Sequence, residues 1–482
     1  MKIEDRKTGI HQPENQTGIS WQINLSKMQN DEDLSVEKAK NPKTIIVDYG
    51  GANVAKPLHV GHLRSAIIGE SIKRMGRFMG HNMIGDVHLG DWGLQMGLII
   101  TELQERHPEL VYFDESFTGE YPDGSTVYDQ RARGDLSLRK RQIRKKDEDY
   151  KKRALEATRE LQQGRRGYRA IWKHIMNVSV ADLKKNYGNL DVHFDLWMGE
   201  SDAQEYIPDM VDYLKDNGYA HYDQGALVVD VKEETDTKEI PPCMILKSDG
   251  AALYDTTDLA TIIQRMKLYK PDEICYLADK RQELHFVQCF RCARKAKLVN
   301  DDTVLSFIGF GTMNGKDGKP FKTREGGVMR LERLIGEIND EMYQKIVENR
   351  SVKDTDARGT AQIVGLSAIK YGDLSNQASK DYVFDVERFT SFEGNTGPYI
   401  LYTIVRTKSI LGKYKEEGNE LKKGALLAPK SDSEKALMLS VSRFNGVVEN
   451  AFEEKAPHKI CAYIYELDKR VQPFLPRDQD LK

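Results

Sequence analysis

The 482-residue chain has few cysteines and no long hydrophobic run. Its five cysteines are an odd number spread thinly over a large chain, a pattern that disfavours a disulfide scaffold and is typical of a reducing compartment. No apolar run approaches the roughly 18 residues that span a bilayer. The first residues, Met1 to Arg6, lack the apolar core of a secretory signal. We therefore expect a cytoplasmic protein with no membrane partner.

Strong charge of either sign is also absent. The formal net charge is −3, with 30% charged and 39% hydrophobic residues. This balance neither favours nor excludes a nucleic-acid partner, which needs only a local basic surface. The length and composition predict a globular protein of roughly two to four domains, each with its own core.

One close cysteine pair raises the question of a metal site. It is Cys289-Phe290-Arg291-Cys292. The segment has a helical pattern, and no second pair follows at the spacing of zinc ligands. We expect two thiols on a helix and no metal site.

The most informative stretch is 53–62, Asn-Val-Ala-Lys-Pro-Leu-His-Val-Gly-His. A buried strand is predicted at 44–49, followed by a glycine turn and a helix whose first turn carries both histidines. Backbone N–H groups and the positive end of the helix dipole favour an anion at such a place. His59 and His62 could stabilise negative charge on a phosphate, and Gly61 would let a nucleotide approach the backbone.

The patterns along the chain divide it into three parts. Residues 1–43 show little periodicity and predict weak order or a small appendage. Residues 44–330 alternate strands with helices, as in a parallel α/β domain, with an insertion around 105–170. Residues 331–482 are mainly amphipathic helix. Strands of the α/β body are expected at 44–49, 83–87, 225–231, 273–277 and 304–308.

Two basic segments could contact phosphates. Residues 131–146 contain eight basic residues and one acid, Asp135, although a solvated loop is favoured by about two to one. The glycine-rich segment 314–327 follows a strand, and its Lys322 and Arg324 could neutralise a leaving pyrophosphate. A hairpin turn within it would look the same.

Taken together, these motifs resemble a known family. The His-Val-Gly-His sequence and the later cationic loop resemble the HIGH and KMSKS elements of class I aminoacyl-tRNA synthetases. Within that class, segments 53–65, 321–327 and 395–399 resemble arginyl-tRNA synthetases, and the resemblance runs from about residue 31 to about 470. It implies a Rossmann-like parallel-sheet catalytic domain followed by an α-helical anticodon-binding domain.

The resemblance implies an activity and its partners. ATP, as its Mg²⁺ complex, would activate L-arginine to arginyl-adenylate, which is then transferred to the 3′ end of arginine tRNA. We expect no tightly bound cofactor and a monomer. The family pattern places His59 and His62 on the phosphates, and Lys322 and Arg324 at the KMSKS positions. Because this loop does not read KMSKS, the family pattern has Lys56 compensate.

Arginine recognition can also be argued from chemistry. A guanidinium is planar, cationic and rich in donors, so it needs directional carboxylates. Tyr254 and Asp258 lie four apart on one predicted helix face and match family positions that read the guanidinium, as does Glu200. Asn53 and Gln282 match residues that hold the amino and carboxylate end. Singly, each is more often a surface or capping side chain.

Four further residues are assigned less specifically. His285 and His88 lie in segments that resemble nucleotide-facing loops, and His285 is expected to contact ATP, although such histidines are more often structural. Tyr399 and Arg406 lie on a helix predicted to contact tRNA. Its apolar stripe is expected to be mostly core, as in a plain helix bundle, and the two roles are compatible.

The chain departs from the family pattern at its ends. The family's N-terminal domain is expected to be missing, and the anticodon-binding domain to be truncated near Pro473 and Pro476. These departures leave open a catalytically impaired relative that acts as a tRNA-binding or regulatory protein. A small-molecule nucleotidyltransferase also stays open, because such enzymes can share the His-x-Gly-His motif.

Overall fold

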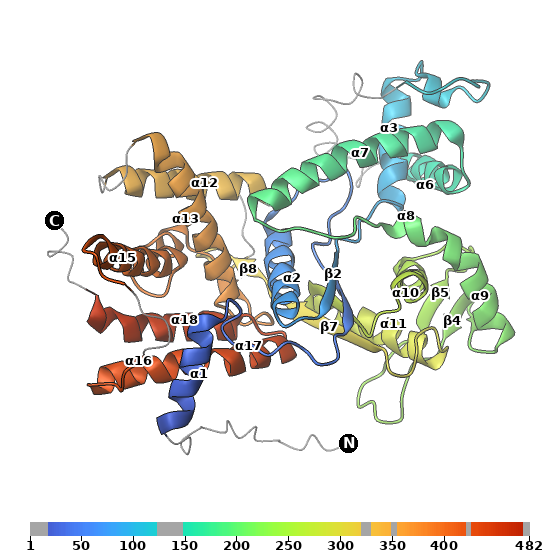
Figure 1. Cartoon of the computed structure of the whole chain (residues 1–482). Coiled ribbons are helices and arrows are strands. Elements are labelled where there is room, and N and C mark those ends of the chain that lie inside the picture. Colours follow the sequence, from blue (N-terminus) through green and yellow to red (C-terminus); the bar gives the residue numbers. More distant parts are fainter. Residues whose placement is uncertain (1–17, 123–147, 320–328, 349–353, 421–425, 476–482) are drawn as a thin grey trace.

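Four parallel strands form the central sheet (Figure 1). The computed structural model describes residues 18–122, 148–319, 329–348, 354–420 and 426–475. The strand order is β2-β1-β6-β7, and every pairing is parallel. This confirms the predicted fold class and the strands expected near 44, 83, 273 and 304. The bounds are β1 Thr44–Asp48, β2 Asn82–Asp86, β6 Glu273–Asp279 and β7 Val304–Phe310.

Helices cover both faces of this sheet. Ile45 and Val47 of β1 belong to one core cluster with residues of α2, whereas Ile46 belongs to a second cluster with residues of α10 and α11. A strand buried on both faces is typical of a parallel sheet, and it explains the continuous apolar run of β1. The helices are α2 Val60–Phe78, α3 Leu94–Arg106, α10 Tyr254–Tyr269 and α11 Glu283–Lys295.

A second, antiparallel sheet lies in the same half of the molecule. The predicted strand at 225–231 is β4, but it pairs with β3 and β5 and is not in the parallel sheet. Gln224 and Gly225 both have positive φ, so they form a tight turn that returns the chain antiparallel. The bounds are β3 His221–Asp223, β4 Ala226–Val229 and β5 Cys243–Leu246.

Short and long helices complete this half. The expected insertion contains helical segments that pack on α3, while the basic run 131–146 lies outside the described residues. These elements are η1 Val111–Phe113, α6 Glu148–Gln162, α7 Arg166–Asn189, α8 Glu200–Ala203, η2 Gln204–Tyr206, α9 Ile207–Asp216 and η3 Lys280–Gln282.

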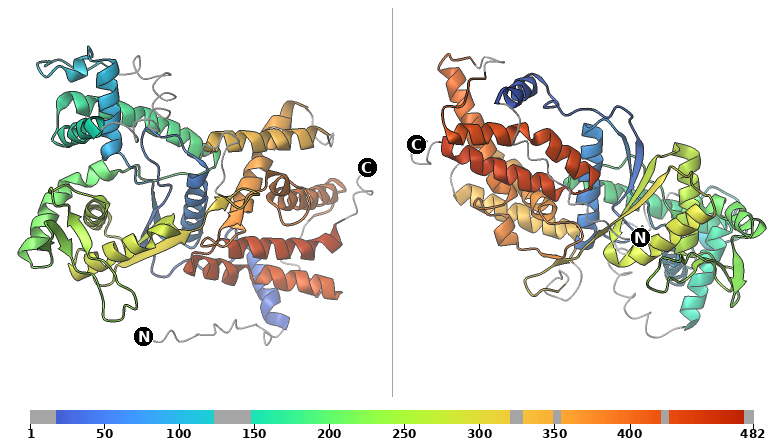
Figure 2. Two further views of the ribbon diagram at one scale, coloured as in Figure 1. Left: turned by 180° about the vertical axis from the view of Figure 1, so that it is seen from behind. Right: turned by 90° about the horizontal axis from the view of Figure 1, so that it is seen from below.

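The C-terminal part is helical, as predicted, and lies on the other side of α2 (Figures 1 and 2). One pair of short parallel strands, β8 and β9, joins the two parts. The elements are β8 Met313–Asn314, α12 Leu331–Glu348, α13 Asp354–Leu374, β9 Tyr382–Val383, α14 Val386–Phe389, α15 Gly397–Glu416, α16 Asp432–Ser442, α17 Phe444–Glu453, α18 His458–Val471 and η4 Gln472–Phe474.

The N-terminal segment also contains a helix. α1, Gly18–Asn30, packs its Leu25 and Met28 against Met438, Val441 and Phe444 of the helical part (Figure 2). α1 therefore packs against helices that lie more than 400 residues later in the sequence.

A buried ion pair fastens α2 to the helical part. Arg64 Nε lies 2.9 Å from Asp373 Oδ1 of α13, and both side chains are almost fully buried. The same guanidinium donates to the carbonyl oxygens of Gly311 and Lys380. In the described part of the chain, no helix combines the length and the hydropathy that a membrane crossing needs.

Candidate active site

The predicted site residues follow three neighbouring strands of the parallel sheet. β1 ends at Asp48, β2 at Asp86 and β6 at Asp279. In a sheet of this type, ligands bind outside the carboxyl ends of the strands. The segments that leave these ends are 49–59, 87–91 and 280–282, and they carry Asn53, Lys56, His59, His88 and Gln282.

The two histidines of the motif form a reciprocal cap at the start of α2. Nδ1 of His59 accepts a hydrogen bond from the Gly61 N–H, and Nδ1 of His62 accepts from the His59 N–H, both at 3.1 Å. The ring centroids are 3.9 Å apart. Because each Nδ1 is an acceptor, a neutral ring carries its proton on Nε2.

Burial keeps these rings neutral. It lowers the pKa of His62 to about 3, with a further contribution from His59. Burial and then the charge of Lys56 lower the pKa of His59. Lys56 therefore lies within electrostatic reach of both rings. Its compensating role stays a prediction. Near neutral pH the site offers two Nε2–H donors beside a helix N-terminus.

Gly61 has a local structural reason in addition to the predicted one. A Cβ atom built at this position would lie 2.8 Å from Cε1 and 2.9 Å from Nδ1 of His59. Only glycine leaves room for the His59 ring over the first turn of the helix. The approach of a nucleotide to this backbone stays a prediction.

Asp258, which is predicted to bind the guanidinium, is paired with His285. Nε2 of His285 lies 2.5 Å from Asp258 Oδ2, and its Nδ1 lies 2.7 Å from Asp255 Oδ1. Burial disfavours the charged ring, but the hydrogen bonds to the two carboxylates outweigh it and raise the pKa of His285 to about 10. Both ring nitrogens are engaged with these carboxylates. The contact of His285 with ATP stays a prediction.

The carboxyl group of Glu200 is affected by the same neighbouring charges. Burial raises the pKa of Glu200 to about 7; the charge of His88 opposes this shift, while Asp91 and Asp258 add to it. The charge of Asp258 therefore acts on Glu200, and the two carboxyl groups form one acidic region. Both ring nitrogens of His88 are buried and make no hydrogen bond with any described residue.

Asp91 fixes the position of Glu200. Its carboxylate accepts hydrogen bonds from the backbone N–H and the hydroxyl of Ser201, at 3.0 and 2.5 Å. The Glu200 N–H donates to Leu89 O. The loop after β2 therefore sets the first turn of α8, on which Glu200 stands.

The remaining predicted arginine contacts are exposed at the rim. Asn53 forms a parallel bridge with Gly90, and a Cβ atom at Gly90 would lie 2.5 Å from Asn53 Oδ1. Tyr254 begins α10, one turn before Asp258, and its side chain is 74% exposed. Gln282 ends η3. The Asn53–Gly90 bridge joins the histidine motif to the loop that carries His88.

The cationic loop is only partly described. Lys322 and Arg324 lie outside the described residues. At its start, Gly318 has a φ of +72° and its N–H donates to Gly315 O, so a tight turn is present there. Lys316 of this turn pairs with Asp385 at 3.2 Å.

The predicted tRNA contacts lie on α15. The Thr396 side chain caps this helix by accepting from the Tyr399 N–H, and the Arg406 guanidinium stacks over Tyr402. The expectation that the apolar stripe is mostly core is wrong, because Ile404 and Val405 are 44% and 62% exposed. The described neighbours of α15 cover only one part of its circumference.

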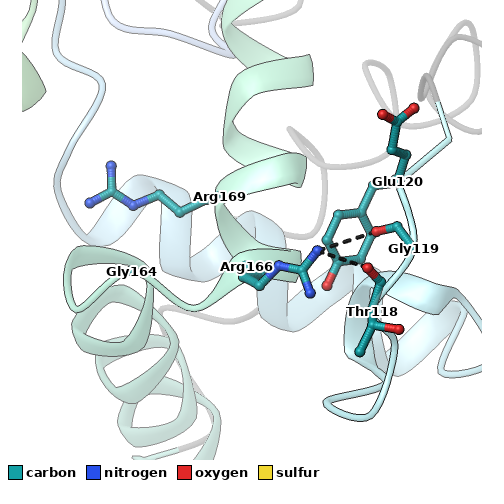
Figure 3. Close-up of a pocket in the computed structure, with 7 residues that line it drawn as sticks. Thr118, Gly119, Glu120, Gly164, Arg166 and Arg169 are labelled. Carbon is teal, nitrogen blue, oxygen red and sulfur yellow. Dashed lines mark hydrogen bonds between the residues drawn. The ribbon is translucent and has the colours of Figure 1, made fainter.

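A separate pocket of about 700 Å³ lies between residues 118–121 and the turn that leads into α7 (Figure 3). None of the predicted site residues lines it. Its Arg166 donates to the carbonyl oxygens of Phe117, Thr118 and Gly119, so this cation supports a loop.

Sequence reasoning missed Asp91 as the anchor of α8, and it missed the pairing of Asp255 with His285. The first had a signal in Gly90-Asp91-Trp92-Gly93, an acidic residue between glycines in the segment that follows β2. The second had none, because α10 and α11 are brought together only by the sheet.

Comparisons with known proteins agree with this geometry. The family model described as tRNA synthetases class I (R), catalytic domain, matches residues 24–386, and the DALR anticodon binding domain matches residues 400–479. An arginine–tRNA ligase of Agathobacter rectalis is 64% identical over 459 residues, which cover 93% of this chain and 77% of the relative. One of Alkaliphilus oremlandii is 58% identical and covers 93% and 76%. The crystal structure of an arginyl-tRNA synthetase from Plasmodium falciparum has the same fold, with a TM-score of 0.78 at 24% identity over 95% of this chain and 76% of that chain.

Proposed function

The chain belongs to the arginyl-tRNA synthetase family, and from that premise we propose how its residues carry out the ATP-dependent ligation of L-arginine to its tRNA. The observation that supports this assignment best is the pair of neutral histidine donors at the N-terminus of α2, in the same part of the molecule as the acidic region of Glu200 and Asp258. We assign catalysis to the domain of residues 44–330 and anticodon binding to the domain of residues 331–482.

In the activation step, the arginine carboxylate attacks the α-phosphorus of ATP. A phosphorus–oxygen bond to arginine forms, the bond to the β-phosphate breaks, and pyrophosphate leaves. The Nε2–H groups of His59 and His62 donate to oxygens on which charge grows in the transition state. Lys56 adds a positive charge nearby, and Lys322 with Arg324 neutralises the departing pyrophosphate. A hydroxyl of the terminal adenosine of tRNA then attacks the arginyl carbonyl carbon, and AMP leaves.

Arginine is selected by its side chain. The carboxylates of Asp258 and Glu200 bind the guanidinium, and the hydroxyl of Tyr254 borders it. Since His285 donates to Oδ2 of Asp258, Oδ1 is left to accept from the substrate. A positioned carboxylate matches the planar fork of a guanidinium better than a mobile one does. Asn53 and Gln282 hold the amino and carboxylate end.

The other partners follow from the same assignment. ATP arrives as its Mg²⁺ complex, and no tightly bound cofactor takes part in the two steps. Tyr399 and Arg406 contact arginine tRNA, and the protein acts as a monomer in the cytoplasm, where tRNA is charged. The impaired-relative alternative rests on the chain ends alone, and no feature of the described site favours it.

Arginine-dependent exchange of pyrophosphate into ATP, with and without arginine tRNA, tests this function. We expect exchange with arginine in the presence of tRNA. Folded protein that is silent in both conditions would refute the enzymatic assignment, and exchange with another amino acid would refute the specificity.

Substitution of Asp258 tests the pocket itself. Asp258→Asn should raise the KM for arginine far more than the KM for ATP, since it removes the negative charge that meets the guanidinium. Asp209→Asn, on the exposed face of α9, is the matched control and should change neither constant. An equal rise of both constants in the Asp258 variant would contradict a guanidinium contact.

A further inference from the structure

Asp255 is a carboxylate beside the arginine-binding residues that the proposed function leaves unused. It lies in the first turn of α10, and only 14% of its side chain is exposed. Its Oδ1 lies 2.7 Å from His285 Nδ1, and its Oδ2 accepts the N–H of Met244 on β5 at 3.2 Å. Because both oxygens are engaged within the protein, Asp255 is suited to supporting another side chain and not to binding a substrate.

The imidazole of His285 bridges two carboxylates of the same helix. Asp255 and Asp258 are three residues apart, so they lie on one face of α10. Their carboxylates meet opposite nitrogens of the ring, Nδ1 at 2.7 Å and Nε2 at 2.5 Å. Bonds on both sides fix the orientation of the ring, and the ring in turn fixes Oδ2 of Asp258.

The backbone of β5 anchors this chain of contacts. In addition to the bond between Met244 and Asp255, the hydroxyl of Thr256 donates to Ile245 O at 2.6 Å. Thr256 is fully buried, and its Oγ1 also accepts the N–H of Leu253. The first turn of α10 is therefore attached to β5 at two places, which restricts the movement of Asp255.

The charges of the three groups suit a cationic substrate. Two carboxylates three residues apart on a helix repel each other. The imidazolium of His285 lies between them, and its raised pKa keeps it charged near neutral pH. Together the three groups carry one negative charge, which matches the single positive charge of a guanidinium.

We propose that Asp255 and His285 are positioning residues for arginine: Asp255 holds the His285 ring, and the ring holds Asp258 in the orientation that meets the guanidinium. We call these three residues the relay. The inference rests on the proposed function, because it requires that Asp258 binds arginine. A carboxylate already held in its bound orientation loses less freedom when the substrate arrives, so the relay raises the affinity for arginine.

Arginine-dependent pyrophosphate exchange in the presence of arginine tRNA tests the relay through two KM values. Asp255→Ala should raise the KM for arginine about tenfold, the scale of one weakened charge-assisted hydrogen bond, and leave the KM for ATP unchanged. Asp255→Asn keeps an acceptor for the Met244 N–H and should raise it less. His285→Leu should raise the KM for arginine at least as much as Asp255→Ala. Since a KM does not depend on the fraction of active protein, a variant that folds poorly still gives the answer.

Asp236→Ala is the matched control. Asp236 is 10% exposed and pairs with Arg291 of α11 at 2.7 Å, so it also anchors this helix through an ion pair. Arg291 lies six residues after His285, about 9 Å along the helix axis. Asp236→Ala should leave both KM values unchanged. A rise equal to that of Asp255→Ala would overturn the proposal, since general anchoring of α11 would then explain the effect.

A double-mutant cycle shows whether Asp255 acts through Asp258. In a chain that carries Asp258→Asn, Asp255→Ala should raise the KM for arginine by less than about twofold, because the residue that it positions has already lost its charge. The same tenfold rise in both backgrounds would mean that Asp255 acts on arginine directly, and would overturn the relay.

Two further results would also overturn it. A rise in the KM for ATP in His285→Leu would assign that ring to the nucleotide, and an unchanged KM for arginine in Asp255→Ala would leave the pair a packing contact. Wild-type protein without arginine-dependent exchange would refute the proposed function and the relay with it. Normal wild-type exchange with unchanged constants in the variants refutes the relay alone.

Discussion

At the scale of single residues, hydrogen bonds between the histidines and the backbone determine what the motif can donate. The Nδ1 atoms of His59 and His62 are both occupied as acceptors, and the rings are neutral because burial lowers the pKa of each. Their contribution to catalysis is therefore directional hydrogen bonding through Nε2. A full positive charge comes instead from Lys56 and from the helix terminus.

Removal of one imidazole should show the size of this effect. His62→Ala should lower the rate of arginyl-adenylate formation on the order of a hundredfold or more, the scale expected for one transition-state donor. Pyrophosphate exchange at saturating arginine and ATP measures it. His221→Ala, on the exposed strand β3, is the control, and a His62 variant with normal exchange would show that the motif is wrongly assigned.

Glu200 should give the arginine affinity a pH dependence. Its raised pKa, about 7, means that the carboxyl group is neutral below that pH and ionised above it. Only the ionised form attracts the guanidinium, so the KM for arginine should fall about tenfold from about pH 6 to about pH 8. Glu200→Gln should flatten this profile, whereas the exposed neighbour Glu205→Gln should leave it unchanged. A falling KM that persists in Glu200→Gln would assign the titration to another group.

At the scale of elements, α2 contributes to the candidate active site and also contacts the helical C-terminal part. Its first turn carries the histidines, and its Arg64 forms the buried pair with Asp373 of α13. Removing one partner leaves an uncompensated buried charge, which costs about 3 to 5 kcal/mol. The helical part is therefore coupled to the position of the catalytic helix.

A double-mutant cycle tests this coupling. Asp373→Asn should lower the free energy of unfolding by about 3 to 5 kcal/mol, and Arg64→Met in the same chain should restore much of the loss. Urea unfolding followed by helical circular dichroism measures both. Glu337→Gln breaks the exposed Arg333–Glu337 pair and should cost less than about 1 kcal/mol. A cost for Asp373→Asn no larger than this would mean that the pair does not connect the two parts.

The elements also show what local sequence could and could not predict. β1 and β6 were predictable because strands buried on both faces are continuous apolar runs. The edge strand β7 is half-buried, but it is also a mostly apolar run. The sheet to which β4 belongs was not, because partner choice depends on the turn at Gln224 and Gly225. The spacing of Tyr254 and Asp258 on one helix was also predictable. The partner of Asp258 was not, since His285 arrives on a helix that follows another strand.

At the scale of the whole molecule, the order of motifs was more informative than composition. The histidine motif, the cationic loop and the segment 395–399 in one chain predicted both the α/β part and the helical part. The exposure of the apolar residues on α15 could be learned only from the structure, because a periodic apolar stripe does not reveal whether another helix covers it. Ile404 and Val405 are exposed beside Arg406, which makes this face available to a large partner.

The salt dependence of tRNA binding tests whether that face receives the nucleic acid. If Arg406 neutralises a phosphate, Arg406→Gln should weaken the binding of arginine tRNA and reduce the slope of log affinity against log salt by about 1. The KM values for arginine and ATP should not change, because Glu200 on α8 and Asp258 on α10 lie on the other side of α2 (Figure 1). Lys215→Gln removes a cation from α9, in the opposite half of the molecule (Figure 1), and should preserve the slope. An unchanged slope in the Arg406 variant, or an equal reduction in the Lys215 variant, would place the tRNA elsewhere.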